Sequence, residues 1–238
     1  MDNIYIPSYK RFERVRAYEY LGCGHIVVPE SQANDYKKRY DKAVIVIPDH
    51  KDGSVTKKRN AILDLIKERE SNGYGWMVDD DFYCLKRKKE NIKMSGDECL
   101  EHFERVQIMA NDMGANYGGF DYSSDNMKLK DMTPFSTTKP IFGAFLLNAT
   151  DGLKYDERLK LNEDVDFFIQ KMNNNRKVIR DNQYVTLFHG EDGGKDSVIK
   201  YDREDQKTYA EIINQKWGYK AMVWERTKFR FYHKIKGA

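Results

Sequence analysis

The chain has 238 residues with 41 basic and 38 acidic side chains, so its formal charge of +3 does not by itself mark a nucleic-acid-binding protein. Its 13% aromatic content excludes a disordered or low-complexity chain, because such chains lack the large apolar groups that offset the entropy of ordering. No apolar run approaches the roughly 20 residues of a membrane-spanning helix, and the first residues lack the pattern of a secretion signal. Three cysteines without a CxxC pair suit a reducing compartment such as the cytoplasm. From the chain length we expect one large folded domain, which acts as a monomer away from membranes.

Short apolar runs alternate with helix-like segments in the first third of the chain. Strands are predicted at residues 3–7, 25–28 and 43–47, with helices at residues 10–20 and 32–40 between them. The three runs lack polar alternation, which is typical of strands buried on both faces in a parallel sheet that helices cover. The order of these elements predicts an α/β fold.

A run of three acids follows the next predicted strand. An amphipathic helix at residues 56–70 precedes an apolar strand at residues 75–78, which leads directly into Asp79, Asp80 and Asp81. The carboxyl ends of strands are where open α/β sheets bind ligands. If the extended conformation persists, the first and third acids project to the same side and could grip Mg²⁺ or Mn²⁺, which prefer oxygen ligands. The alternative is a solvated acidic turn.

The second half is less regular, with no repeat and no interdomain linker. A helix is predicted at residues 98–113, followed by a Gly-rich stretch at residues 114–120. The remaining predicted elements are a strand at residues 139–148, a helix at residues 162–172, a strand at residues 178–188, a helix at residues 204–216, and a basic and aromatic tail.

Two more positions carry side chains of catalytic type. Glu163, Asp164 and Asp166 open the predicted helix at residues 162–172, where one carboxylate could act as a general base. Acids in the first turn of a helix also stabilise its dipole, so a purely structural role stays open. His189 ends the last long strand and could bind a metal or form a turn, and Lys195 could meet a phosphate.

In their order and spacing over residues 4–195, these motifs resemble the GT-A nucleotide-sugar glycosyltransferases. The resemblance rests on the opening Ile4-Tyr5-Ile6-Pro7-Ser8-Tyr9, on Lys58-Arg59-Asn60 at the head of a helix, on the Asp run, on Phe142-Gly143-Ala144, on Glu163-Asp164 and on the late His189. It implies a GT-A (Rossmann-like) three-layer α/β/α fold with a mainly parallel central sheet. The single domain would comprise a nucleotide-sugar-binding half at residues 1–81 and an acceptor-binding half at residues 82–238.

The resemblance also implies roles for particular residues. The base and ribose pocket would be lined by Pro7, Ser8, Tyr9 and Arg11. Arg59, Asn60, Asp79, Asp80 and Lys195 would contact the rest of the nucleotide sugar, with Lys195 neutralising the diphosphate. Mn²⁺ or Mg²⁺ would be held by Asp79, Asp81 and His189, although the triple Asp also allows Asp80 with either neighbour. Asp164 would be the base of an inverting displacement, with Asp166 and Glu163 as further catalytic candidates.

Within this superfamily the chain is similar to the phage-encoded TET-associated glycosyltransferases. The Ile-Pro-Ser-Tyr-Lys-Arg opening, the Asn-Glu-Asp-Val-Asp element and the compact length carry the similarity. It implies metal-dependent transfer of a hexose or pentose from a UDP-sugar to the hydroxymethyl group of a modified pyrimidine in phage DNA, with 5-hydroxymethylcytosine as the first expectation, in the host cytoplasm. The alternatives are a GT-A enzyme with a polysaccharide, lipid or protein acceptor, and a metal-dependent nuclease or DNA-binding module.

Two basic segments favour DNA as the acceptor. One is Lys86-Arg87-Lys88-Lys89, and the other is the tail at residues 216–238, which holds seven basic residues against one acidic residue. Six aromatic residues run through that tail: Trp217, Tyr219, Trp224, Phe229, Phe231 and Tyr232. Cations that contact phosphates and rings that stack on an extruded base are what such an acceptor requires. The alternative is that these rings pack on the protein core.

Overall fold

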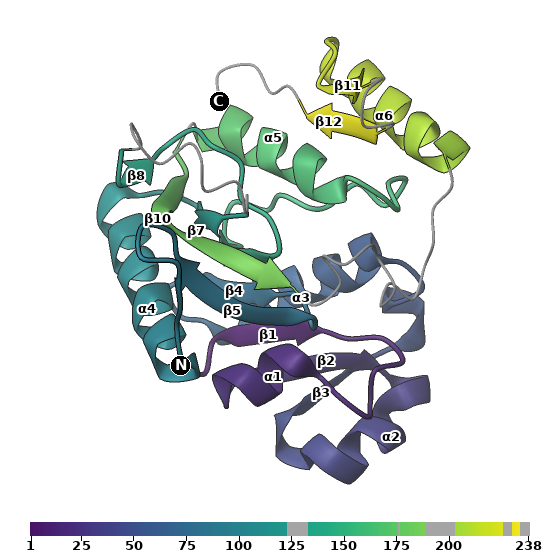
Figure 1. Cartoon of the computed structure of the whole chain (residues 1–238). Helices are drawn as coiled ribbons and strands as arrows, with labels where there is room; N and C mark the ends of the chain where they lie inside the picture. Colours follow the sequence, from purple (N-terminus) through teal and green to yellow (C-terminus); the bar gives the residue numbers. More distant parts are fainter. Residues whose placement is uncertain (123–132, 176, 189–202, 226–229, 234–238) are drawn as a thin grey trace.

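The computed structural model describes residues 1–122, 133–175, 177–188, 203–225 and 230–233, and Figure 1 shows their arrangement. The expectations for His189 and Lys195 therefore lie outside the described residues. Within the described part of the chain, no helix combines the length and the apolar character needed to cross a membrane.

The first half of the chain forms four parallel strands with helices between them. The strands are β1 (Ile4–Pro7), β2 (His25–Pro29), β3 (Val44–Ile47) and β4 (Tyr74–Val78). The helices are α1 (Arg16–Leu21), α2 (Glu30–Tyr40) and α3 (Val55–Arg69), with short 3₁₀ turns η1 (Asp41–Ala43) and η2 (Asp49–Lys51) on either side of β3. Strand β1 pairs in parallel with both β2 and β4, and β2 pairs in parallel with β3.

The second half extends the same sheet and adds three long helices. Its strands in the sheet are β5 (Phe82–Arg87), β6 (Ile92–Lys93), β7 (Tyr117–Asp121), β8 (Phe135–Ser136), β9 (Ala144–Asn148) and β10 (Ile179–Phe188). The helices are α4 (Gly96–Met113), α5 (Glu163–Asn175) and α6 (Arg203–Trp217). Strands β11 (Met222–Glu225) and β12 (Arg230–His233) pair antiparallel in a separate two-stranded sheet. The strand order is β3-β2-β1-β4-β9-β7-β10-β5-β6, with β8 beside β10.

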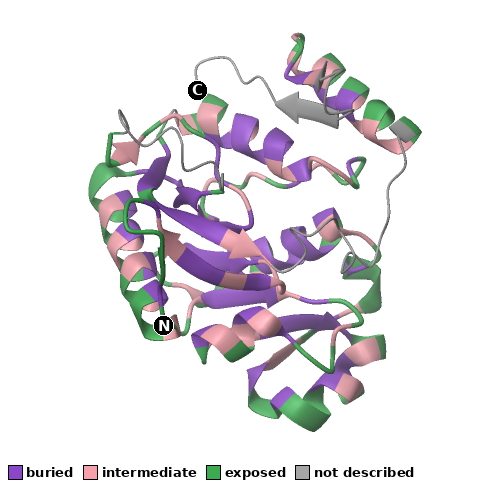
Figure 2. Cartoon of the chain, in the orientation of Figure 1, coloured by how far each residue is buried: buried purple, intermediate pink, exposed green. Residues whose placement is uncertain are grey.

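Helices cover both faces of the sheet. Along β1, Ile4 and Ile6 face one hydrophobic core with α1, α2 and α4, whereas Tyr5 faces a second core with α3 and α5. Figure 2 shows the buried strands between these layers. The predicted α/β fold with helices on both faces of a mostly parallel core is confirmed; the antiparallel strand β9 separates the parallel block β3-β2-β1-β4 from the parallel pair β7 and β10.

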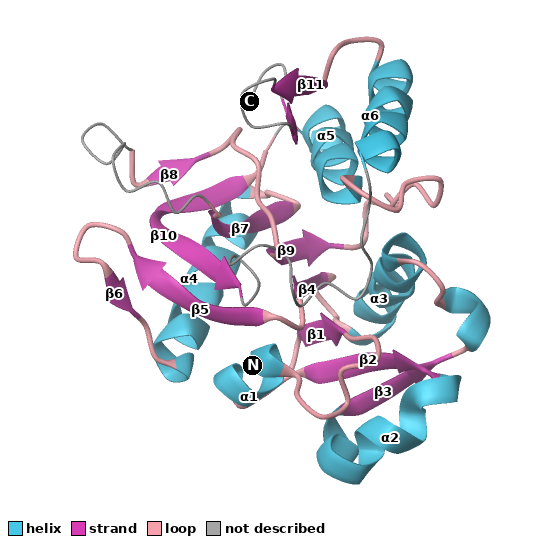
Figure 3. Ribbon diagram, turned by 45° about the vertical axis from the view of Figure 1, so that its right-hand side comes forward, coloured by secondary structure: helices cyan, strands magenta, loops and turns pink. Residues whose placement is uncertain are grey.

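A further layer lies outside α5. Helix α6 and strand β11 pack on α5 through a third hydrophobic cluster, and the two helices lie side by side in both Figure 1 and Figure 3. The cluster consists of Leu159, Val165, Ile169, Ala210, Ile213, Ala221 and Met222. Among the described residues, the last elements of the chain are thus attached to α5 through this cluster.

The helix expected at residues 10–20 begins only at Arg16. Lys10 has a positive φ of 56°, and two backbone N–H groups of the preceding loop bond to tyrosine hydroxyls of α2. Arg11 donates to Tyr36 and Val15 donates to Tyr40, both at 2.9 Å. Partners from a distant helix therefore replace the helical hydrogen bonds that the local sequence favours.

Strand β7 overlaps the Gly-rich stretch at residues 114–120, where no strand is predicted because glycine has low strand propensity. A Cβ at Gly118 would lie 3.1 Å from side-chain atoms of Ile179 and Val106, so β7 packs closely against β10 and α4 at this position. No strand is predicted at β5 either, because its last two residues, Lys86 and Arg87, belong to a basic run.

Candidate active site

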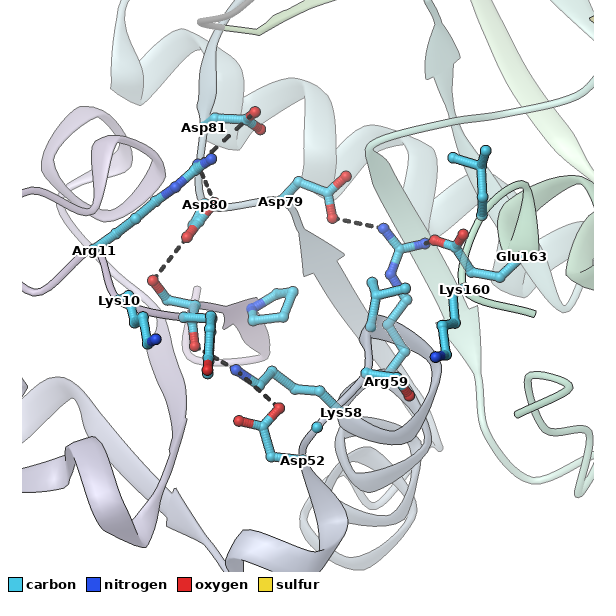
Figure 4. Close-up of a pocket in the computed structure, with 17 residues that line it drawn as sticks. Lys10, Arg11, Asp52, Lys58, Arg59, Asp79, Asp80, Asp81, Lys160 and Glu163 are labelled. Carbon is cyan, nitrogen blue, oxygen red and sulfur yellow. Dashed lines mark hydrogen bonds and ion pairs between the residues drawn. The ribbon is translucent and has the colours of Figure 1, made fainter. Parts of the chain in front are cut away.

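A cavity of about 580 Å³ opens at the carboxyl ends of β1 and β4. Three segments from the first half of the chain and one from the second form its walls, as Figure 4 shows. The lining residues are Pro7, Ser8, Tyr9, Lys10, Arg11, Asp52, Gly53, Ser54, Val55, Lys58, Arg59, Asp79, Asp80, Asp81, Lys160, Leu161 and Glu163. The structure thus brings together most of the residues that the sequence singled out.

The three aspartates after β4 point in different directions. The strand ends at Val78 and the chain turns, with Phe82 N–H donating to the Asp79 carbonyl at 3.0 Å, so the extended conformation does not persist. Asp79 accepts a 2.8 Å bond from Arg59. Asp80 accepts from Ser8 at 2.7 Å and from Arg11 at 2.6 Å. The carboxylate of Asp81 lies 3.9 Å from Arg11, and its side chain remains 30% exposed.

These carboxylates repel one another. Burial, together with the charges of Asp79 and Asp80, raises the pKa of Asp81 to about 7, against the opposing effect of Arg11. A cation at this strand end would relieve the repulsion. Asp80 is the least available of the three, because Ser8 and Arg11 already occupy both of its oxygens.

The donor set at this strand end fits a hard divalent cation. Asp79 and Asp81 offer only oxygen ligands, and Mg²⁺ or Mn²⁺ commonly takes one or two protein carboxylates together with substrate phosphates. Among the described residues, no three side chains of His, Cys, Asp or Glu converge into a complete metal cage. The described residues could therefore contribute two carboxylates, Asp79 and Asp81, to the binding of a divalent cation in the open pocket.

Arg59 joins the two sides of the pocket. Its side chain comes from α3 and is 5% exposed, and it lies 2.8 Å from Asp79 and 3.2 Å from Glu163 of α5. Its guanidinium also lies over the rings of Phe145 and Tyr155, at 5.1 and 5.6 Å from their centroids. Arg59 is therefore a buried cation that two carboxylates neutralise.

The acids at the start of α5 have perturbed ionisation. Burial raises the pKa of Glu163 to about 7, although the nearby Arg59 opposes this. Burial also raises the pKa of Asp164, again against Arg59. A carboxylate with a raised pKa is a better proton acceptor, as a general base requires.

Sequence reasoning assigned no role to several pocket residues. Lys58 is 4% exposed, donates to the Ser8 carbonyl and lies 3.4 Å from Asp52. Its ammonium is also 5.3 Å from the ring centroid of Tyr9, which is 37% exposed at the rim. Lys160 reaches the pocket from the segment before α5. The sequence features that could have indicated these pocket residues are the position of Asp52 in a turn before a helix and the position of Lys58 next to Arg59.

Three expected site residues do not line the cavity. The side chain of Asn60 is bound to the backbone of Tyr155, accepting at 2.7 Å and donating at 3.0 Å. Asp164 lies beside the pocket, with one oxygen accepting from Val165 N–H at 2.8 Å. Asp166 is fully buried on the outer side of α5, where it accepts hydrogen bonds from Gln170, Lys216 and Trp217.

Parts of the two basic segments are structural. Lys88 is 4% exposed and pairs with buried Asp121. Lys216 and Trp217 bind Asp166, and Tyr219 packs against the α5–α6 cluster. For these residues the core-packing alternative holds, and the side chains of the tail from Trp224 onward lie outside the described residues.

The model of the TET-Associated Glycosyltransferase family matches residues 3–189 of this chain, and no curated protein sequence matches it. The structure is similar to Staphylococcus aureus TarS 1-349 in complex with UDP, at 14% identity and a TM-score of 0.51, over 92% of this chain and 72% of that one. It is also similar to glucosyl-3-phosphoglycerate synthase from Mycobacterium tuberculosis in complex with Mg²⁺ and UDP, at 8% identity and a TM-score of 0.55, over 97% of this chain and 86% of that one. The complex of that enzyme with Mn²⁺, UDP and phosphoglyceric acid gives 7% identity and a TM-score of 0.52, over 97% and 85% of the two chains. At such identities the likeness concerns the fold, which is of the GT-A type.

Proposed function

The chain belongs to the TET-associated glycosyltransferase family, and from this premise we propose that it moves a sugar from a UDP-sugar to the hydroxymethyl group of a modified pyrimidine in DNA, with 5-hydroxymethylcytosine as the expected base. The observation that carries the proposal is the cavity at the β4 end, where Asp79 and Asp81 face a pocket lined by four lysine and arginine side chains from the first half of the chain. Carboxylates for a cation and cations for phosphates, in one pocket, suit a nucleoside diphosphate.

The donor nucleotide would occupy the side of the cavity formed by the loop after β1. Tyr9 offers an exposed ring face for the base, and Lys58 with Asp52 offers a donor and an acceptor next to it. Pro7, Ser8 and Arg11 line the same side. The diphosphate would then lie toward Asp79 and Asp81, with Lys160 reaching it from the acceptor half. Lys195 and His189 remain part of the proposal as further phosphate and metal contacts.

Asp79 and Asp81 would hold Mn²⁺ or Mg²⁺, and a bound divalent ion stabilises the negative charge that develops on a departing diphosphate. The chain's own contribution at this point is to keep the two carboxylates in place. Arg59 fixes Asp79, and Arg11 lies between Asp80 and Asp81.

Asp164 would accept the proton of the acceptor hydroxyl. The contacts of Asp166 with Gln170, Lys216 and Trp217 favour Asp164 for this role, because a carboxylate whose oxygens are already bound on the far side of the helix cannot reach a substrate in the cavity. Glu163 would act through Arg59, which it contacts at 3.2 Å, and so keep Asp79 oriented.

The proposal is tested by incubating the protein with a panel of nucleotide sugars and Mn²⁺ on three matched DNAs, which carry cytosine, 5-hydroxymethylcytosine or 5-hydroxymethyluracil at the same sites. Digestion to nucleosides and mass spectrometry should show a gain of one sugar on a hydroxymethylated base only, with the DNA strands intact. UDP release without any gain on DNA would favour a polysaccharide, lipid or protein acceptor, and strand cleavage would favour a nuclease; either result would overturn the DNA proposal.

A further inference from the structure

The C-terminal unit, defined here as α6 with β11 and β12, lies outside the range that matches the family model. It is nevertheless attached to the part of the chain that forms one wall of the cavity. Leu159, Val165 and Ile169 pack with residues of α6 and β11 in one hydrophobic cluster. The connecting segment at residues 156–166 therefore contributes residues both to the cavity and to the cluster with the C-terminal unit.

A single ammonium group joins the two ends of this connecting segment. Lys216 Nζ lies 3.1 Å from Asp156 and 2.8 Å from Asp166, two residues that are ten positions apart in the sequence. The side chains of both acids are shielded, at 12% and 0% exposure. Among the described residues, removing the ammonium would leave Asp166 without an ion pair and Asp156 paired with Arg158 alone.

Three residues between these two ends face the pocket. Lys160, Leu161 and Glu163 line the cavity, and Asn162 between them has a positive φ of 58°, so the backbone turns sharply there. Just before this stretch, Asn60 of α3 fixes the backbone of Tyr155 with two hydrogen bonds. The segment is therefore held to α3 at its start and to α6 along its outer side.

Lys160 has a particular place among the pocket cations. Lys58 pairs with Asp52, Arg11 with Asp80, and Arg59 with Asp79 and Glu163. Lys10 and Lys160 have no ion pair within the described residues. Of these two, Lys160 belongs to the connecting segment, and Figure 4 shows its ammonium on the cavity side, below Glu163. Its charge is thus available to a ligand phosphate, provided that the segment holds it there.

We propose that Lys216 is a positioning residue for the donor site: by bridging Asp156 and Asp166 it holds the connecting segment so that Lys160 faces the diphosphate of the donor. The proposal rests on the proposed UDP-sugar site and adds a part of the chain beyond the family region to it. Arg158 and, to a lesser extent, Lys216 lower the pKa of Asp156. Asp156 therefore stays charged and can hold the ammonium of Lys216.

The test is a double-mutant cycle on the affinity for UDP, measured by calorimetry on the full chain with Mn²⁺. We expect Lys216→Met and Lys160→Met each to weaken UDP binding by about tenfold, the size of one lost hydrogen bond to a charged group. If Lys216 acts through Lys160, the double variant should be no weaker than either single variant. Lys216→Arg should restore most of the affinity, because a guanidinium can reach both carboxylates.

Lys207→Ala is the matched control, since Lys207 lies on the same helix, is 54% exposed and pairs only with Glu204, at 4.0 Å, in the described structure. Thermal unfolding of each variant separates a loss of fold from a loss of position, and Asp156→Asn, which leaves the buried Asp166 pair in place, serves if Lys216→Met is too unstable. Additive effects of the two substitutions, or unchanged UDP affinity in Lys216→Met and Asp156→Asn, would overturn the proposal. Failure of the unmodified protein to bind UDP at all would instead contradict the proposed function.

Discussion

Arg59 donates a 2.8 Å hydrogen bond to Asp79 from a side chain that is only 5% exposed. The same guanidinium lies 3.2 Å from Glu163, so the acidic end of β4 and the acidic start of α5 share one buried cation. This couples the position of a proposed metal ligand to the helix that carries the proposed base.

Arg59→Met should therefore destabilise the protein strongly. Removing one partner of a buried ion pair leaves an uncompensated charge, and such substitutions cost about 3 to 5 kcal/mol in the free energy of unfolding. Urea denaturation measures the change. Arg14→Met is the control, because Arg14 is 62% exposed and its pair with Glu19 should contribute less than about 1 kcal/mol. Equal effects of the two substitutions would contradict the account of Arg59.

Asp81→Asn should abolish sugar transfer without unfolding the protein. The substitution removes one of three mutually repelling carboxylates, so the melting temperature should stay the same or rise, while the affinity for Mn²⁺ in the presence of UDP should fall. Asp80→Asn should instead lower the melting temperature, because Asp80 accepts hydrogen bonds from Ser8 and Arg11. Full activity in EDTA, or in Asp81→Asn, would rule out the metal role of this strand end.

Substitutions of the two candidate bases should separate catalysis from structure. We expect Asp164→Asn to lower kcat by about 100-fold to 10,000-fold, the usual contribution of a general base, with little change in stability. Asp166→Asn should mainly lower the melting temperature, because Asp166 binds Lys216 and Trp217 behind the helix. A larger loss of kcat in Asp166→Asn than in Asp164→Asn, at equal stability, would assign the base to Asp166.

Gly143→Ala should be more damaging than an ordinary glycine substitution. Gly143 has a φ of 75°, and an added Cβ would lie 2.0 Å from Cζ of Phe188. Gly152 is the matched control, because its φ is 72° but no atom lies within 4 Å of its added Cβ. Gly152→Ala should cost about 1 kcal/mol for backbone strain alone. Gly143→Ala should cost about 1 to 3 kcal/mol more in the free energy of unfolding, through overpacking. The substitution should also weaken Mn²⁺ binding, because the Gly143 carbonyl accepts a hydrogen bond from the Asp79 N–H. Equal melting temperatures of the two variants would contradict this packing.

His102 predicts a pH dependence away from the active site. Burial, together with the nearby charges of Arg105 and Arg87, lowers its pKa from 6.5 to about 4. Between these two values the unfolded chain binds a proton that the folded protein does not, so stability rises with pH over this window and is lost as the pH falls through it. His102→Gln should remove this component, so the stability difference from the unmodified protein should change between pH 6.5 and pH 4. A difference that is constant with pH would contradict the shift.

Local patterns were sufficient for the framework of the fold and for the acidic strand end. Apolar runs identified β1 to β4, and the acids after β4 were visible because a buried strand seldom ends in three of them. Local patterns could not show which carboxylate faces the cavity, because the turn after Val78 and partners about 70 positions away, Ser8 and Arg11, orient Asp80.

The start of α5 could not be resolved from sequence for the same reason. Asp164 and Asp166 are two residues apart and chemically identical, yet Asp166 is fixed by Trp217 and Lys216, about 50 positions later in the chain. The loop after β1 was also mistaken for helix, because tyrosine hydroxyls of α2 satisfy its backbone. In each case a long-range hydrogen bond decides what the local pattern leaves open.

The most direct test of the central claim is the release of UDP from UDP-sugars in the presence of Mn²⁺, measured on two DNAs of the same sequence that differ only in cytosine or 5-hydroxymethylcytosine. We predict UDP release that is equal to the number of modified bases, appears only with the hydroxymethylated DNA and is lost in Asp81→Asn. No UDP release above that of unmodified DNA, with any donor, would contradict the account.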